Sequence, residues 1–263
     1  MCNNFDIITS IDSKTIVVII YKIKMKTLKL FALLLFANLL FINASVQAAN
    51  VLKGRQIRQV TGFHGISVSS GIDLQLTQEN VEKVSVEAES EDLDKIITKV
   101  EDGILKIYIK DKSWSGFNWM KRPHKVYVSF KEMDQLHASA GSGVNAESSL
   151  KLGSLAIHVS SGANVTLDLE ATDMDVHASS GCGINLKGHT KVLKADASSG
   201  SHIHASELEC KKCTASVSSG AGIKVNVTEE LDANASSGGN ISYSGNPSSK
   251  NIHKSSGGGV NAR

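Results

Sequence analysis

The sequence predicts an all-β protein: a parallel β-helix, or solenoid, of about seven coils of ~19 residues each, preceded by an antiparallel β cap region. The first observation is a Ser-Ser-Gly-like triplet that recurs seven times, with successive glycines 21, 19, 19, 20, 18 and 19 residues apart. The second is the alternation of apolar and polar residues on both sides of each triplet, which is typical of strands with one buried face. The triplets end at Gly141, Gly162, Gly181, Gly200, Gly220, Gly238 and Gly257.

The residues that follow each glycine define which side of the strand faces inward. The third is always Val or Ile, and we expect it to point into the solenoid: Val144, Val165, Ile184, Ile203, Ile223, Ile241 and Val260. The second is Gly, Asn or His, and we place the tight bend there because Gly and Asn tolerate left-handed backbone angles: Gly143, Asn164, Gly183, His202, Gly222, Asn240 and Gly259. Propeller blades and helical repeats need longer units. A meander sandwich with the same alternation is the alternative.

The region 49–135 has a different pattern and is expected to cap the solenoid formed by 136–263. Residues 66–76 contain the same triplet with the same apolar offsets, so they form either an outlying coil or a first strand pair. Asp102-Gly103 is a typical two-residue hairpin turn, and it would join the strand 96–100 to the strand 104–109. Solenoid ends need such caps because an uncovered coil exposes its apolar interior.

The first 48 residues are not expected to belong to the fold. Residues 25–48 show a basic start, an apolar run and a small-x-Ala cleavage pattern, which is the layout of a secretory signal peptide. Residues 1–24 precede the better start at Met25 and are interpreted as a mis-assigned extension. The apolar run is shorter than the ~20 residues of a membrane span. The protein is therefore expected to be exported, to the periplasm, the outer-membrane surface or the medium, and not to be an integral membrane protein.

The charge of the mature chain excludes a nucleic-acid partner. The first 49 residues hold five of the 28 basic and two of the 26 acidic side chains, which leaves 23 basic against 24 acidic residues. A nucleic-acid-binding protein needs a basic stripe, and this chain has none after its leader.

Three segments of the sequence resemble the auto-transporter adhesin "head GIN domain" family of Bacteroidota. They are the opening segment 62–74, the block 93–105, and the Ser-Ser-Gly repeats, in which Gly183-Ile184-Asn185 reproduces the GIN tripeptide. The resemblance covers most of the mature chain. It implies a secreted, β-helix-like protein with an adhesin-like role, and it supplies no catalytic residues.

Two patterns in the repeats could carry chemistry. His137, His158 and His177 lie four residues before successive repeat glycines, so they should stack on an outward face, followed by Asp196. Parallel imidazoles converge poorly on a metal ion, and a polar surface column is the favoured interpretation. Cys210-Lys211-Lys212-Cys213 lies between coil strands, where it forms a local disulfide or two unpaired thiols. We expect no catalytic residues, no cofactor and no metal.

The aromatic residues Trp114, Phe117 and Trp119 are the candidate ligand-binding residues. They lie within six residues of one another, whereas the repeats contain almost no large aromatics. Exposed aromatic rings can stack on sugars or dock a partner. The favoured function is a non-catalytic binding or adhesion module with a surface glycan or an envelope protein as its partner. The alternatives are a polysaccharide-processing β-helix enzyme and a structural, self-associating envelope protein.

Overall fold

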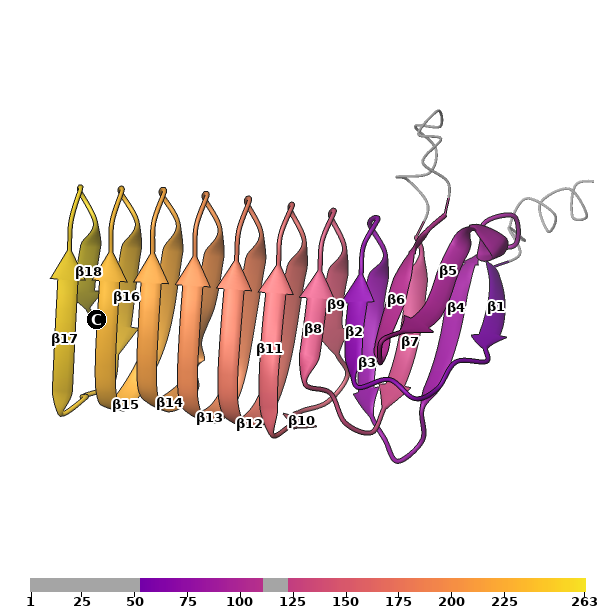
Figure 1. The fold of residues 1–263 in the computed structure, drawn as a ribbon, viewed down its shortest axis with the longest axis horizontal. Coiled ribbons are helices and arrows are strands. Elements are labelled where there is room, and N and C mark those ends of the chain that lie inside the picture. The colour runs from indigo at the N-terminus through magenta and orange to yellow at the C-terminus, as the bar shows by residue number, and fades with distance from the viewer. Residues whose placement is uncertain (1–52, 111–122) are drawn as a thin grey trace, which may run out of the picture. The chain divides into compact units, whose positions relative to one another are not determined.

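The computed structural model describes residues 53–110 and 123–263, which belong to one compact unit, Lys53–Arg263. In its C-terminal part each coil consists of two strand arms joined by a short turn, and the turns line up along one edge (Figure 1). The prediction of an all-β solenoid is confirmed. The strands of this part are β8 Gln135–Ala138, β9 Gly143–Ala146, β10 Leu150–Lys151, β11 Ser154–Val159, β12 Asn164–Ala178, β13 Gly183–Ala197, β14 His202–Val217, β15 Gly222–Ala235, β16 Asn240–Ser244, β17 Ser249–Lys254 and β18 Gly259–Ala262.

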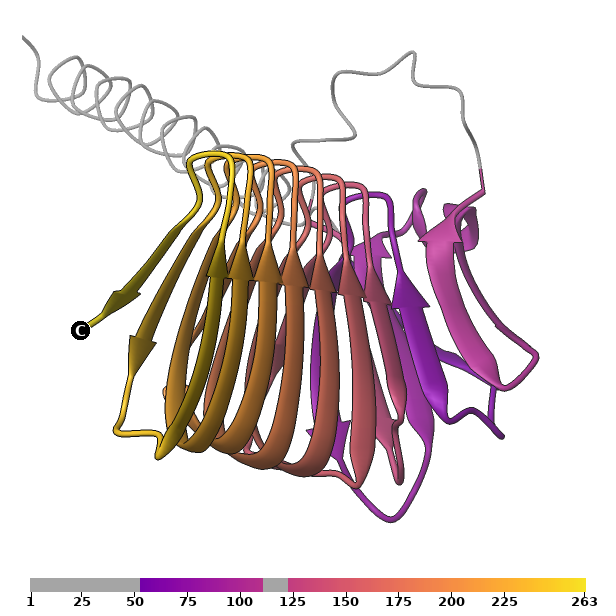
Figure 2. The ribbon, with the colours of Figure 1, turned by 60° about the vertical axis from the view of Figure 1, so that its left-hand side comes forward.

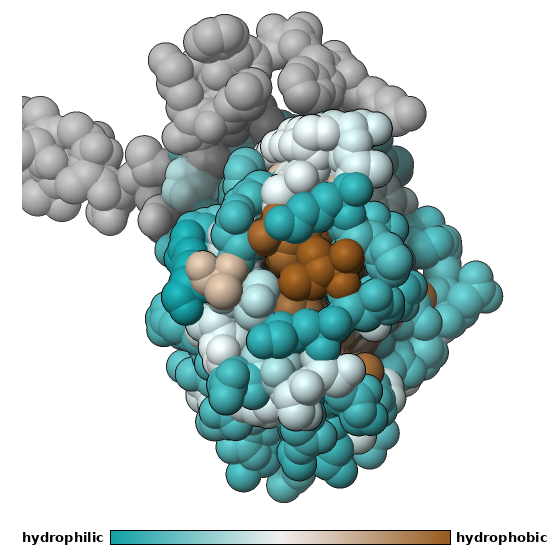
Figure 3. Space-filling view, turned by 90° about the vertical axis from the view of Figure 1, so that its left-hand side faces the viewer, coloured by the Kyte–Doolittle hydropathy of each residue, from teal (hydrophilic) through white to brown (hydrophobic). Residues whose placement is uncertain are grey.

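The coils pair in parallel, and the register follows the repeat. Strands β12 to β15 each run through the second arm of one coil and the first arm of the next, curving from one sheet to the other (Figure 2). Val165 pairs with Ile184, and Ile184 pairs with Ile203. The expected inward column is confirmed, since its members expose between 0% and 5% of their surface: Val144, Val165, Ile184, Ile203, Ile223, Ile241 and Val260. Figure 3, which looks along the solenoid onto the last coil, shows this apolar interior ringed by hydrophilic side chains.

The tight bend lies in the triplet itself, so its predicted position two residues after the glycine is wrong. In the coil at Ser160, residues Ser161 and Gly162 have φ angles of 52° and 72°, and the Ala163 N–H donates to the Ser160 carbonyl over 3.1 Å. Two consecutive positive φ angles define a type I′ turn, which matches the twist of the adjoining strands. The Gly162 N–H donates to the Ser180 carbonyl of the next coil over 3.2 Å, so the turns are also bonded to one another.

The residues two positions after the turn glycines, mostly Gly and Asn, pack against one another between neighbouring coils. In register they form a column in which a polar side chain alternates with glycine: Asp73, Gly143, Asn164, Gly183, His202, Gly222, Asn240 and Gly259. A Cβ atom on Gly183 would lie 2.7 Å from the Asn164 side-chain oxygen, closer than real contacts allow. Each polar side chain therefore lies over the glycine of the next coil. These residues are the first of their strands and have none of the left-handed angles of the turn.

Antiparallel strands occur in the N-terminal region, as predicted. β5 pairs with β6 through a turn at Asp102 and Gly103, whose φ angles of 52° and 74° are those of a type I′ hairpin. β4 pairs antiparallel with both β1 and β7. The elements here are β1 Lys53–Arg58, β2 Gly65–Val68, β3 Asp73–Gln78, β4 Lys83–Glu89, the 3-10 turn η1 Leu93–Lys95, β5 Ile96–Glu101, β6 Ile104–Ile109 and β7 Lys125–Phe130.

The first coil layers do not follow the order of the chain. β2 and β3 form a coil whose turn, at Ser70 and Gly71, has the same left-handed angles as the repeats. This coil lies between two others: β2 pairs in parallel with β6 and β8, and β3 pairs in parallel with β7 and β9. Residues 66–76 are thus an outlying coil, one of the two possibilities that the sequence allowed.

Candidate functional site

A shallow groove of about 680 Å³ runs beside the turns, along the outward face of strands β2, β8 and β11 to β15. Two columns of polar residues line it, and both repeat once per coil. One column begins with the predicted histidines: His137, His158, His177, Asp196, Ser216 and Asn234. The other is a serine from each turn: Ser139, Ser160, Ser179, Ser198, Ser218 and Ser236. The groove offers a ladder of hydrogen-bonding groups at the spacing of neighbouring strands.

The three histidines stack as the sequence predicts. The ring centroids of His137 and His158 are 4.9 Å apart with an interplanar angle of 6°, and those of His158 and His177 are 4.8 Å apart at 9°. Partial burial lowers the pKa of His137, and the neighbouring His158 lowers it further. Burial likewise lowers the pKa of His158, with a contribution from His177. At neutral pH these two rings are therefore uncharged, and each offers one donor and one acceptor nitrogen.

The stability of the protein is expected to fall with acidification because of this column. The folded pKa values of His137 and His158 lie below the ordinary 6.5. The unfolded chain therefore takes up protons first, and stability is lost as pH falls through 6.5 toward the folded values, with no effect above 6.5. A His137→Gln/His158→Gln variant should show a smaller drop in its urea midpoint between pH 7.5 and pH 5. Equal drops in the variant and the wild type would contradict the shifted histidines.

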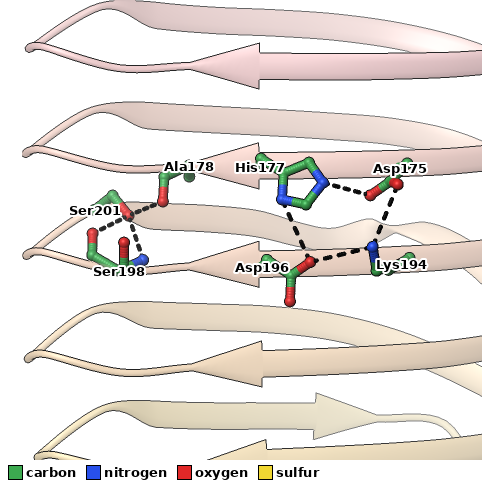
Figure 4. A network of polar contacts seen from close by, with 7 residues as sticks. All are labelled: Asp175, His177, Ala178, Lys194, Asp196, Ser198 and Ser201. Carbon is green, nitrogen blue, oxygen red and sulfur yellow. Dashed lines mark hydrogen bonds and ion pairs between the residues drawn. The ribbon is translucent and has the colours of Figure 1, made fainter.

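A network of four titratable residues continues the histidine column (Figure 4). Asp175 and His177 lie on β12 and pair in register with Lys194 and Asp196 on β13. The two nitrogens of His177 lie 2.8 Å from Asp175 Oδ1 and 3.3 Å from Asp196 Oδ2. Lys194 Nζ lies 3.4 Å from Asp175 Oδ2 and 3.7 Å from Asp196 Oδ2. Of these contacts, the one between Lys194 and Asp175 has the geometry of a hydrogen bond, in which the ammonium donates to Asp175 Oδ2.

Three residues of the same network could act as ligands of a metal ion. Ligand atoms of Asp175, His177 and Asp196 lie within 4.8 Å of one another, so these residues could hold a cation. Lys194 already places a positive charge beside both carboxylates. The sequence pointed to Asp196 and the histidines but missed Asp175 and Lys194. Both lie two residues before a member of the histidine column, which puts them on the same outward face of the strand.

Small inward residues support the turn beneath the groove. Ser201 is fully buried, and its hydroxyl lies 2.7 Å from the Ser198 carbonyl and 2.9 Å from the Ala178 carbonyl of the preceding coil (Figure 4). Ser142 and Cys182 occupy equivalent positions, and the Cys182 thiol contacts the Val159 carbonyl at 3.1 Å. These contacts tie the turns at Ser142, Cys182 and Ser201 to the preceding coil.

The cysteines of the described residues are free thiols inside the solenoid. Contact with Cys210 and burial raise the pKa of Cys213 well above its ordinary value, and burial raises that of Cys182. A nucleophilic or redox-active cysteine needs the opposite shift, since the thiolate is the reactive form. Cys182, Cys210 and Cys213 therefore act as small core residues here.

The predicted aromatic site, Trp114, Phe117 and Trp119, lies outside the described residues, as do the expected extension 1–24 and signal peptide 25–48. What the structure gives is the position of the strands on either side. The segment 111–122 joins β6 to β7, and β6 pairs with β2, whose Ser67 lines the groove.

The fold and the groove together define a parallel β-solenoid with a polar groove along its turns. None of the residues that the structure describes form a helix long and apolar enough to cross a membrane. The chain belongs to the family described as "Putative auto-transporter adhesin, head GIN domain", whose sequence profile matches residues 62–247. No curated protein matches the chain.

Solved structures with the same fold include proteins from Bacteroides and Parabacteroides. A putative adhesin from Bacteroides fragilis has a TM-score of 0.74 at 21% identity, covering 80% of this chain and 96% of that one. A putative adhesin from Parabacteroides merdae has a TM-score of 0.63 at 16% identity, covering 80% and 95%. A putative lipid binding protein from Parabacteroides distasonis has a TM-score of 0.60 at 20% identity, covering 81% and 98%. At these identities the likeness is one of fold.

Proposed function

We propose that this protein is an exported, non-catalytic binding module of the cell envelope, with an adhesin-like role and a surface glycan as its ligand. The observation that carries the proposal is the groove, whose hydroxyl and imidazole groups repeat from coil to coil. Family membership supports an adhesin-like role. The leader-like pattern of residues 25–48 supports export.

The chemistry of the groove favours a glycan over an apolar or strongly charged ligand. Serine hydroxyls and neutral imidazoles both donate and accept hydrogen bonds, as sugar hydroxyls do. The groove is open and shallow, so it suits an extended chain that lies across several coils better than a small molecule that needs enclosure. The imidazole faces of the stacked rings lie against one another, which leaves their edges for the ligand.

The charged groups of the groove support binding over catalysis. Glycoside hydrolysis uses a pair of carboxylates, one as acid and one as nucleophile or base. Asp196 is the carboxylate that lines the groove, with Asp175 beside it, and both are engaged by Lys194 and His177. Because both carboxylates already contact Lys194, neither stands free for one of these roles.

We also propose that Trp114, Phe117 and Trp119 contact the same ligand. Aromatic rings that stack on sugars add affinity to hydrogen bonds made by a polar groove. The segment that carries these rings follows β6, which is separated from the groove-lining Ser67 by one strand spacing.

A glycan array probed with the protein tests both parts of the proposal. We expect binding to a subset of neutral glycans, weakened strongly by His137→Ala/His158→Ala, since these side chains supply the edges of the groove. Replacing Trp114, Phe117 and Trp119 together by Ala should lower affinity more than a hundredfold, at roughly 1 kcal/mol per ring.

The matched controls for this experiment keep the fold and change other positions. Thr166→Ala/Asn185→Ala alters exposed residues on the other sheet, and Ser115→Ala/Asn118→Ala alters polar residues of the aromatic segment. Both should bind as the wild type does. If the groove variant is folded and binds normally, the groove is not the site. If the aromatic variant binds normally, those rings are not part of it.

A further inference from the structure

A cluster of basic residues lies on the second sheet, on β14 and β15 and directly after β18, apart from the histidine groove. His202 and His204 lie on β14, Lys224 on β15, and Arg263 directly follows β18. In register, His204 pairs with Lys224, which places two basic side chains beside each other. The rings of His202 and His204 have centroids 6.2 Å apart. Arg263 is anchored by its backbone N–H, which donates to the Tyr243 carbonyl over 2.9 Å.

The charges of this cluster are not neutralised within the part of the chain that the structure describes. No carboxylate of the described residues lies within 4.0 Å of the basic nitrogens of these four side chains. Several lysines of β13 and β14 do have such a partner: Lys187 pairs with Glu207, Lys211 with Glu229, and Lys212 with Glu230. Lys224 and Arg263 therefore line one hollow with no carboxylate partner among the described residues, which leaves both available to a ligand of opposite charge.

The neighbouring groups that shift the pKa of His204 all act in the same direction. Burial lowers the pKa of His204, and Lys224, His202 and Arg263 lower it further. The neighbouring residues from β13 and β16 are uncharged, Asn185 on one side of the column and Ser242 on the other. A bound anion would reverse the effect of these cations and favour the protonated imidazole.

The cluster surrounds a hollow that can receive a group of the size of a sugar unit. Its volume is about 530 Å³, and its lining includes the backbone of Gly220, Gly222 and Gly238. Gly222 lies in register between His202 and Asn240, so the absence of a side chain there leaves space between two polar ones. The Asn240 amide and the Ser242 hydroxyl add uncharged polar groups to the wall.

We propose that this hollow binds an anionic substituent, a sulfate or a carboxylate, carried by an acidic glycan. Lys224 and Arg263 supply permanent charge, with the guanidinium suited to bidentate contact with a planar or tetrahedral oxyanion. His202 and His204 add charge when protonated. Binding therefore strengthens as pH falls and weakens as salt rises. The site is separate from the groove and does not depend on the groove's ligand.

The experiment measures binding of heparin oligosaccharide to the full chain by calorimetry at pH 7.5 and pH 5.5, with a neutral dextran oligosaccharide of equal length as control. We expect binding to heparin only, tighter at pH 5.5. Lys224→Gln/Arg263→Gln should weaken it by about tenfold or more, the loss expected from removing charge-assisted contacts. His202→Gln/His204→Gln should abolish the pH dependence.

The matched control is Lys211→Gln/Lys212→Gln, which removes the same net charge from two lysines that already have glutamate partners. It should leave heparin binding unchanged. Equal weakening of heparin binding by both double variants would overturn the proposal, because the loss of affinity would then follow from the net charge of the protein and not from this site. So would the absence of heparin binding at pH 5.5 in low salt. Binding to phosphatidylglycerol vesicles without binding to heparin would also overturn it, in favour of a membrane surface.

Discussion

Replacing Ile184 by Asp is expected to destabilise the protein by roughly 3–5 kcal/mol, the cost of an unpaired buried charge. Ile184 is fully buried, and its neighbours in register are Val165 and Ile203, both apolar and fully buried. The interior of the solenoid is a narrow column, so the carboxylate finds no polar partner there and cannot reach water without opening a coil. Chemical denaturation followed by circular dichroism would measure the change.

The control for this substitution is the next residue along the strand. Asn185 faces solvent, so Asn185→Asp introduces the same charge on the same strand without burying it. Its unfolding midpoint should stay close to that of the wild type. A normal midpoint for Ile184→Asp would mean that the inward and outward faces of β13 are exchanged.

Gly188→Ala is expected to destabilise the protein by roughly 3–5 kcal/mol, from backbone strain and overpacking together. Gly188 lies in the middle of β13 with a φ angle of 106°, which L side chains rarely adopt. It pairs with Leu169 of the preceding coil, and a Cβ atom would overlap the Leu169 carbonyl oxygen. Neither backbone can withdraw without breaking the hydrogen bonds between the coils.

A second glycine separates the two causes. Gly200, in a turn, also has a positive φ, 70°, but a Cβ atom there would have no neighbour within 4 Å. Gly200→Ala should therefore lower the free energy of unfolding by only ~1–2 kcal/mol, the cost of the left-handed conformation for an L residue. If both variants lose the same stability in thermal or urea unfolding, the close approach to Leu169 has no effect, and strain alone explains Gly188.

The periodicity of the sequence was sufficient to predict the fold and the inward column. Residues such as Val165, Ile184 and Ile203 recur at the same offset from each turn, and burial by parallel stacking is the simplest way to satisfy that pattern. The position of the bend could not be read correctly. A glycine required by a left-handed angle, such as Gly162, and one required by a neighbour's side chain, such as Gly183, look alike in one sequence.

The candidate sites were only partly predictable. The histidine stack follows from the repeat, and so would the pairing of Asp175 with Lys194, which lie one repeat apart. The basic cluster was missed because its members do not repeat at one offset: His204 and Lys224 pair in register, whereas His202 lies two residues earlier and Arg263 comes from the last coil. Only the three-dimensional structure brings them around one hollow.

The position of the β2–β3 coil between two later segments has a consequence for the order of folding. Within the repeats, paired residues are about 19 positions apart, and such local contacts form quickly. Gly65, in contrast, pairs with both Ile104 and Gln135, so its coil is complete only after β6 and β8 have arrived. We therefore expect the N-terminal layers to form more slowly than the repeats, in which each coil needs only a short chain closure.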